Sequence, residues 1–271
     1  MARWGFGLAV MMAALYMACT PLSQASVEAP SWEPIAFGPR DADFVGAIDL
    51  RGVRHDPLFG PLVSQLARRD DLGVLLRASQ IDLVASVDRG RPVTWIAVVH
   101  GVEGAPSRAD VGSSVGDVVT VAGAWILGEG AAFEHVRSGT SLPLSPIAMP
   151  GRALVASTVQ GRAFPHQAHD PLGATTDGLV EATVEMLGGA HLEFVLQCRY
   201  VDGKAARHAA AAARLVLLAA ATRDDLASVL ARSLMKVDFD VSGDLVSVRV
   251  TISDDLRDAL QSYVERGVSA G

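Results

Sequence analysis

The chain of 271 residues is 50% hydrophobic and 20% charged, which suffices for one large domain or two small ones and argues against disorder. Its formal net charge of −7 argues against nucleic acid as a partner and against polybasic adhesion to anionic lipid. The two cysteines are Cys19 and Cys198. Processing of the N-terminus takes Cys19 out of disulfide chemistry, so we expect Cys198 to be a single thiol.

The N-terminal segment has the anatomy of an export signal. Arg3 supplies a positive charge, and residues 5–18 form an apolar run. This run is shorter than the roughly 20 residues of a membrane-spanning helix. Two cleavage sites follow it, and an uncleaved anchor is a third alternative. One precedes Cys19, and the other follows Ala25 in the tripeptide SQA, an A-x-A-like site for release as a soluble protein.

The tetrapeptide YMAC, residues 16–19, resembles the lipobox of bacterial lipoproteins, in which a small residue precedes the cysteine. In this feature the chain is similar to many uncharacterised lipoproteins of Gram-negative bacteria. The resemblance covers only the N-terminal signal. It implies a signal peptide over residues 1–18 and a diacylglyceryl thioether on Cys19, and it implies no activity. Residues 19–40 contain Ser and Pro and are predicted to be a flexible tether that holds a domain off a membrane.

Periodic apolar residues begin after the tether and define a first predicted unit, residues 41–104. Its first strand is indicated by strict alternation of apolar and polar residues, and its first helix by the recurrence of leucine at helical spacing after Pro57. The predicted order is strand, helix, helix, strand, strand, at residues 43–50, 57–69, 70–78, 81–88 and 92–101.

The last part of the chain, residues 171–271, shows a similar order. The predicted elements are a strand, a long helix broken near residue 222, a hairpin and a final helix, at residues 191–201, 204–233, 236–252 and 253–267. Cys198 lies on the inward face of its strand. We therefore expect a small, buried and inert side chain there.

The repeated order of strands and helices predicts a structural duplication. Residues 105–170, between the two units, add further strands, a short helix near residues 131–137 and loops. We interpret the whole as an α+β fold with duplicated strand-helix-helix-strand-strand units and mainly antiparallel sheets. Because identity between the copies is slight, the interpretation rests on order and periodicity. A different strand order in residues 43–100 and 191–252 would contradict it.

Residues 205–221 are rich in alanine and raise the question of a membrane-spanning helix. Arg207 and Arg214 interrupt this segment, and with Lys204 and His208 they form a polar stripe. Charged side chains are costly inside a bilayer. We therefore favour a helix that packs on a sheet through its alanine face.

Two glycine motifs partly match known functional patterns. GSSVG, residues 112–116, would make Ser114 the nucleophile of a G-x-S-x-G turn, but a strand follows the motif instead of preceding it. GEGAAF, residues 128–133, lies between a predicted strand and a helix, as in a dinucleotide fingerprint, but Phe133 replaces the third glycine. We interpret them as a loop of small residues and an ordinary glycine turn, and we predict no cofactor.

His166, His169 and Asp170 are the candidate metal ligands, because imidazole and carboxylate groups suit zinc or copper. Pro165 and Pro171 flank this cluster and indicate a loop. No further ligand can be named from spacing, so an exposed polar loop is the favoured interpretation.

DFDVSG, residues 238–243, matches the opening of a calcium-binding loop. Arg249 stands where the closing bidentate glutamate of such a loop would be, and the flanking segments are predicted strands. A hairpin with acidic residues on its wet face is therefore favoured over a calcium site.

Together, these features predict an exported protein that is anchored by lipid on Cys19 and acts as a non-catalytic binding or structural module in the cell envelope. Its predicted partners are a membrane, reached through that lipid, and an unknown protein or small-molecule ligand. Thr20 follows the cysteine in place of an Asp. In the enteric lipoproteins that this signal resembles, the absence of Asp at that position implies the outer membrane over the inner membrane. The alternatives are a soluble secreted or periplasmic protein, and a periplasmic hydrolase or metal-dependent enzyme using Ser114 or the cluster around His166.

Overall fold

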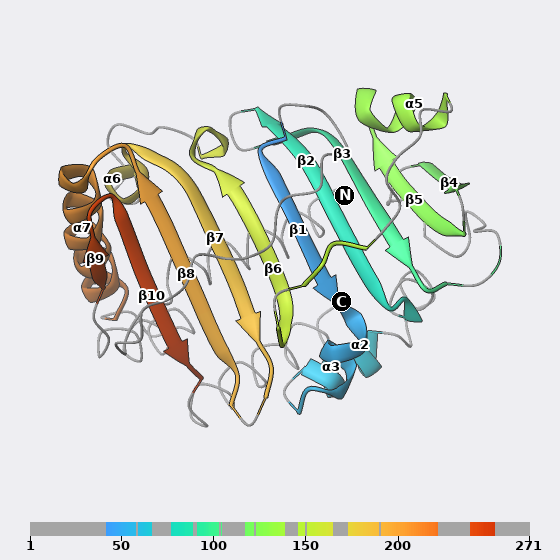
Figure 1. Ribbon diagram of the computed structural model, residues 1–271, viewed down its shortest axis with the longest axis horizontal. Helices are drawn as coiled ribbons and strands as arrows, with labels where there is room; N and C mark the ends of the chain where they lie inside the picture. The colour runs from blue at the N-terminus through green and yellow to red at the C-terminus, as the bar shows by residue number, and fades with distance from the viewer. Residues whose placement is uncertain are drawn as a thin grey trace. The chain divides into compact units, whose positions relative to one another are not determined.

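The computed structural model describes residues 42–57, 59–66, 77–88, 91–102, 104, 117–121, 123–138, 146–149, 151–164, 173–189, 191–221 and 239–252. Figure 1 labels their helices and strands. The described residues fall into two compact units. The N-terminal unit ends at Val159, and the C-terminal unit begins at Gln160.

The N-terminal unit is built on antiparallel strands in the order β4-β5-β3-β2-β1-β6. These strands are β1 (Phe44–Asp49), β2 (Gln80–Asp88), β3 (Arg91–His100), β4 (Asp117–Val121), β5 (Ala124–Glu129) and β6 (Ala153–Gln160). Three short helices accompany them, α2 (Leu50–His55), α3 (Phe59–Leu66) and α5 (Ala131–Arg137). The strand after the tether, the two strands after residue 80 and the helix near residues 131–137 are confirmed.

Both faces of this sheet carry buried apolar side chains. On one face, Val84, Val98 and Ile126 pack with Phe133 of α5. On the opposite face, Val99 and its neighbours form a second cluster, which consists of Leu50, Ala78, Ala97, Val99, Trp125 and Leu127. Burial on both faces explains why β3 reads as an almost continuous apolar run instead of an alternating one.

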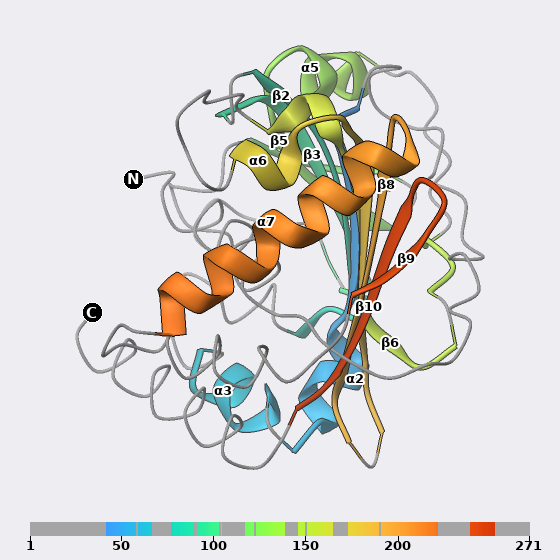
Figure 2. The same ribbon diagram turned by 90° about the vertical axis from the view of Figure 1, so that its left-hand side faces the viewer.

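The C-terminal unit has antiparallel strands in the order β7-β8-β10-β9. They are β7 (Leu179–Leu187), β8 (Glu193–Tyr200), β9 (Asp240–Ser242) and β10 (Leu245–Thr251). The helical elements are the short η2 (Gly161–Ala163), α6 (Gly173–Thr176) and the long α7 (Gly203–Ala221). Figure 2 shows α7 and α6 on the same side of β8 and β10.

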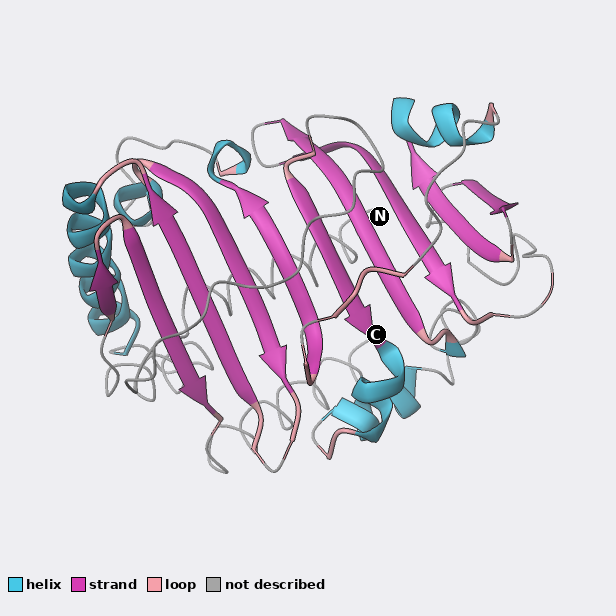
Figure 3. Ribbon diagram, in the orientation of Figure 1, coloured by secondary structure: helices cyan, strands magenta, loops and turns pink. Residues whose placement is uncertain are grey.

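The predicted fold class is wrong. Ten strands supply most of the regular structure among the described residues, and the helices are few and mostly short, as Figure 3 shows by colour. The protein is therefore mainly β. The strands of the middle segment explain the difference, because β5 pairs with β3 and β6 pairs with β1. They enlarge a sheet that the prediction had treated as a small separate unit.

The predicted duplication is also wrong, because the strand orders differ. In the first predicted unit β1 pairs with β2, the strand that follows its helices. In the last part of the chain β8 pairs with β10 instead, and β9 lies outside β10 at the edge. The described helices that follow β1 and β8 also differ in length. α7 has 19 residues and is about 28 Å long, which is enough to run the length of a strand, whereas α2 and α3 have six and eight.

Candidate functional site

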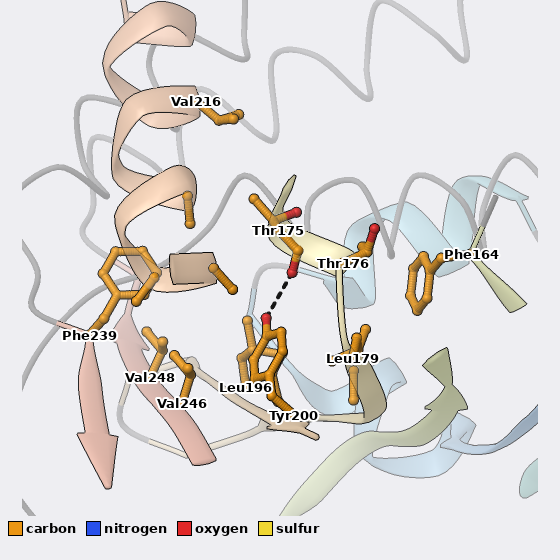
Figure 4. A pocket seen from close by; sticks show the side chains of 15 residues that line it. Phe164, Thr175, Thr176, Leu179, Leu196, Tyr200, Val216, Phe239, Val246 and Val248 are labelled. Carbon is orange, nitrogen blue, oxygen red and sulfur yellow. Dashed lines mark hydrogen bonds between the residues drawn. The ribbon is translucent and has the colours of Figure 1, made fainter. Parts of the chain in front are cut away.

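An apolar cavity lies in the C-terminal unit between α7 and the facing side of the sheet, and Figure 4 shows it from close by. Its volume is about 60 Å³. Aliphatic and aromatic side chains make up most of the lining, with two threonines, one cysteine and one tyrosine. The residues that line it are Phe164, Thr175, Thr176, Leu179, Ala182, Leu196, Cys198, Tyr200, Ala209, Ala210, Ala213, Val216, Phe239, Val246 and Val248.

The sheet wall of the cavity follows from strand alternation. Leu196, Cys198 and Tyr200 are spaced by two residues in β8, so they point to one face. The register sets Cys198 opposite Ala182 of β7 and Val246 of β10. The wall is therefore a patch contributed by three neighbouring strands.

The helix wall consists of three alanines and Val216. Ala209 and Ala210 of α7 are 1% and 7% exposed, and Ala213 lies one turn further on. Asp202 caps the helix, because its Oδ1 accepts hydrogen bonds from the backbone N–H groups of Lys204 and Ala205 at 2.9 and 2.7 Å. The cavity exists because alanine side chains stop short of the sheet.

Two polar side chains of the lining are held in unreactive states. The Tyr200 hydroxyl donates a hydrogen bond to the carbonyl oxygen of Thr175 at 2.8 Å, and burial raises its pKa. Burial also raises the pKa of the Cys198 thiol to about 12. Because a thiolate is the reactive form of cysteine, this thiol is a poor nucleophile at neutral pH. The expectation that Cys198 is inert agrees with this environment, but the residue is half-buried instead of fully buried.

A cluster of hydrogen-bonded polar side chains lies in the N-terminal unit, and the sequence patterns did not predict it. Asp82 of β2 is fully buried, and its Oδ2 accepts hydrogen bonds from His100 Nε2 at 2.9 Å and from the N–H of Ile147 at 3.0 Å. Its Oδ1 accepts from Gln80 Nε2 at 2.7 Å. Gln80 also donates to the carbonyl oxygen of Ile147 at 2.9 Å. This network attaches residues 146–149 to β2 and β3.

The predicted site residues are not among those that the structure describes. Cys19, Ser114, His166, His169 and Asp170 all lie outside the described ranges. Lipidation of Cys19 therefore stays a prediction, and the candidate metal ligands and the alternative of a nucleophilic Ser114 stay untested. Within the described ranges, no group of three or more His, Cys, Asp and Glu side chains is arranged to hold a metal ion.

The structure explains the two motifs that do fall in described segments. Phe133 is 2% exposed and packs against Gly128, where an added Cβ would lie 2.9 Å from its ring. GEGAAF is thus a glycine turn into α5. In DFDVSG, the part from Asp240 onwards forms β9 and the turn into β10, and Gly243 has a φ of +62°. Arg249 lies 3.7 Å from the Glu193 carboxylate. The structure of these segments agrees with the glycine turn favoured for GEGAAF and with the hairpin favoured for DFDVSG.

The alanine-rich segment forms α7, which packs on the sheet as expected. Among the described residues, no helix combines the length and apolar character needed to cross a membrane. The sequence identified the alanine face and the inward position of Cys198. It did not show that these groups line a common cavity, because the lining is assembled from residues as far apart as Phe164 and Val248.

No known family model and no curated protein sequence matches this chain. Among solved structures, it is similar to crystal form I of TP0453, with 12% sequence identity and a TM-score of 0.42. The alignment covers 88% of this chain and 98% of that one. At this level of similarity the match carries no argument about fold or function.

Proposed function

We propose that this chain is an exported protein of the cell envelope, anchored through lipid on Cys19, that acts as a non-catalytic binding module. Its ligand site is the cavity between α7 and the sheet of the C-terminal unit. The export signal and the tether support the location, and the cavity supports the binding role. The outer membrane is the favoured site of anchoring.

The observation that carries the binding role is the apolar lining on both walls. Alanines of α7 face aliphatic side chains of β8 and β10, among them Leu196, Val246 and Val248. Burial of an apolar group in such a site is favourable, because it removes apolar surface from water. The Cys198 thiol is held protonated and the Tyr200 hydroxyl is already hydrogen-bonded, so the lining suits binding better than acid–base or nucleophilic chemistry.

Xenon tests the ligand site without favouring any ligand shape. Xenon under pressure is expected to shift the methyl NMR signals of Val246 and Val248 and to leave exposed Val201 unchanged. The Ala210→Leu variant, which fills the cavity, is expected to abolish the shifts. Ala211→Leu is the matched control, because Ala211 is exposed on the same helix. Absence of xenon binding to the native protein would overturn the ligand site.

The intact mass of the protein extracted from membranes tests the anchor. The expected mass is that of a chain that begins at Cys19 and carries acyl chains. The mass of a chain that begins at Ser26 and carries no acyl chains would contradict the lipid anchor. It would support the alternative of a soluble exported protein. In that case the cavity remains a candidate ligand site, since its test does not depend on lipidation.

A further inference from the structure

We infer that the outward face of α7 binds the surface of a bilayer that contains anionic phospholipid. This inference goes beyond the ligand site, and it draws on the proposed function only for the nearness of a membrane. It follows from exposed leucines and exposed cations that share one side of a helix without carboxylates.

The outward face of α7 lies opposite the alanines that line the cavity. Exposed residues recur on it at intervals of three or four, which places them on one side of a helix. They include Lys204, Arg207, Ala211, Leu215 and Leu218. The face extends for about 21 Å along the helix axis. Figure 2 shows α7 along one side of β8 and β10, and the outward face is the side turned away from these strands.

Two leucines give this face an apolar end. Among the described residues, four large apolar side chains are exposed, and two of them lie three residues apart on α7. They are Leu215, which is 68% exposed, and Leu218, which is 51% exposed. Neighbouring exposed apolar side chains with polar residues around them are typical of an interaction surface. Removal of these side chains from water is favourable at the boundary between the headgroups and the acyl chains of a bilayer.

The charges of the helix favour an anionic partner. Gly203–Ala221 contains Lys204, Arg207 and Arg214 and no Asp or Glu. Asp202 precedes the helix, and its carboxylate accepts hydrogen bonds from backbone N–H groups of the first turn. The chain as a whole has a net charge of −7, so the positive face is a local feature. Its attraction acts over about 10 Å at 0.1 M salt, which lipid phosphates in contact with the face satisfy.

The size of the face favours a bilayer over a protein partner. A strip about 21 Å long and about 10 Å wide offers roughly 200 Å², whereas a stable protein interface buries about 800 Å² on each partner. A bilayer needs no matching shape, because it presents phosphate groups above hydrocarbon at every point of its surface. A lipid on Cys19 would hold the chain at the membrane, where a weak contact of this kind suffices.

Sedimentation with lipid vesicles tests the inference. The protein is the mature chain from residue 19 carrying Cys19→Ser, because a signal peptide and an acyl chain would each bind vesicles by themselves. It is expected to bind vesicles of equal parts phosphatidylglycerol and phosphatidylcholine. Binding to phosphatidylcholine alone is expected to be about tenfold weaker or more. Binding to the anionic vesicles is expected to fall in about 0.5 M NaCl.

Variants of α7 locate the contact. Leu215→Ser combined with Leu218→Ser is expected to lower the affinity for anionic vesicles about tenfold or more. Val180→Ser is the matched control, because Val180 is exposed in β7, and it is expected to keep the native affinity. Arg207→Gln is expected to lower the affinity about fivefold. Arg51→Gln, at an exposed residue of α2, is its control, and melting curves show that all variants are folded.

Several results would overturn the inference. Equal affinity for neutral and anionic vesicles would do so, as would an affinity of the double leucine variant equal to that of the native chain. A dimer in the absence of vesicles that the double leucine variant abolishes would assign the face to a second copy of the chain. None of these results bears on the ligand site or on the lipid of Cys19, which xenon binding and the intact mass test separately.

Discussion

The carboxylate of Asp82 and the imidazole of His100 lie 2.9 Å apart inside the N-terminal unit, and their side chains are 0% and 9% exposed. An ionised carboxylate only accepts hydrogen bonds, so His100 Nε2 is the donor. Asp82 receives two further hydrogen bonds, from Gln80 and from the N–H of Ile147. Because β2, β3 and residues 146–149 all converge on one buried carboxylate, this group links segments far apart in the sequence.

We predict that Asp82→Asn destabilises the protein by about 1–3 kcal/mol. The amide places a donor where the carboxylate accepted hydrogen bonds, and it leaves a buried donor unsatisfied. Urea denaturation at pH 7 measures the change in the free energy of unfolding. Asp240→Asn is the control, because Asp240 is exposed on β9, and it is expected to change stability by no more than about 0.5 kcal/mol.

The coupling of Asp82 to His100 can be measured separately. In a double-mutant cycle with Asp82→Asn and His100→Ala, an interaction free energy above about 0.5 kcal/mol is expected for two side chains in one network. Strictly additive effects, or a loss for Asp82→Asn equal to that of the control, would contradict the importance of the buried carboxylate.

The Cys198 thiol is expected to react slowly with thiol reagents in the native protein. Its pKa is raised from 9.0 to about 12 by burial, so the thiolate is scarce at pH 8. With Cys19→Ser present, labelling of the native chain is expected to be at least a hundredfold slower than labelling in denaturant. Similar rates in the two states would show that the cavity wall does not bury this thiol.

The same shift of the Cys198 pKa predicts a dependence of stability on pH. Above about pH 9 the unfolded thiol loses its proton while the folded one keeps it, so the unfolded state binds fewer protons. Stability is therefore expected to fall as pH rises from about 9 to 12. In Cys198→Ala this decline is expected to be shallower in denaturation curves across that range. An unchanged slope would contradict the raised pKa.

Enlarging the cavity is expected to destabilise the protein. Leu196→Ala removes three carbon atoms from the sheet wall and is expected to cost about 1–2 kcal/mol, because Leu196 is half-buried. The melting temperature of the variant is expected to fall below that of the native protein. Leu215→Ala is the matched control, because Leu215 is 68% exposed on α7. Equal behaviour of the two variants would argue against Leu196 as part of the wall.

Gly161 is expected to tolerate no side chain. A Cβ at this position would meet the carbonyl oxygen of Leu179 in β7, far inside van der Waals contact. Gly161→Ala is therefore expected to force a backbone shift and destabilise the protein by about 1–3 kcal/mol. Arg162→Ala, at the neighbouring exposed residue, serves as the control in thermal denaturation. A native-like melting temperature for Gly161→Ala would show that η2 can move away from β7 at little cost.

Local patterns predicted individual elements well and their assembly poorly. The alternation of residues 43–50 and of β8 reflects a preference that each strand carries in its own sequence. The pairing of β6 with β1, and of β10 with β8, joins strands that are separated by many tens of residues. The periodicity of residues within one segment does not specify which distant strand it pairs with. The predicted fold class and the predicted duplication were wrong for this reason.

The candidate site shows the same division. By itself, the sequence predicted an export signal with a lipobox-like cysteine, and it indicated an alanine-faced helix and an inward Cys198, because each of these patterns depends on neighbouring residues. Only the tertiary structure decided that the alanines face Leu196 and Val248 across a cavity, and that Asp82 meets His100. The physical reason is that volume and buried hydrogen bonds arise where distant segments meet, and that meeting depends on the register and order of the strands.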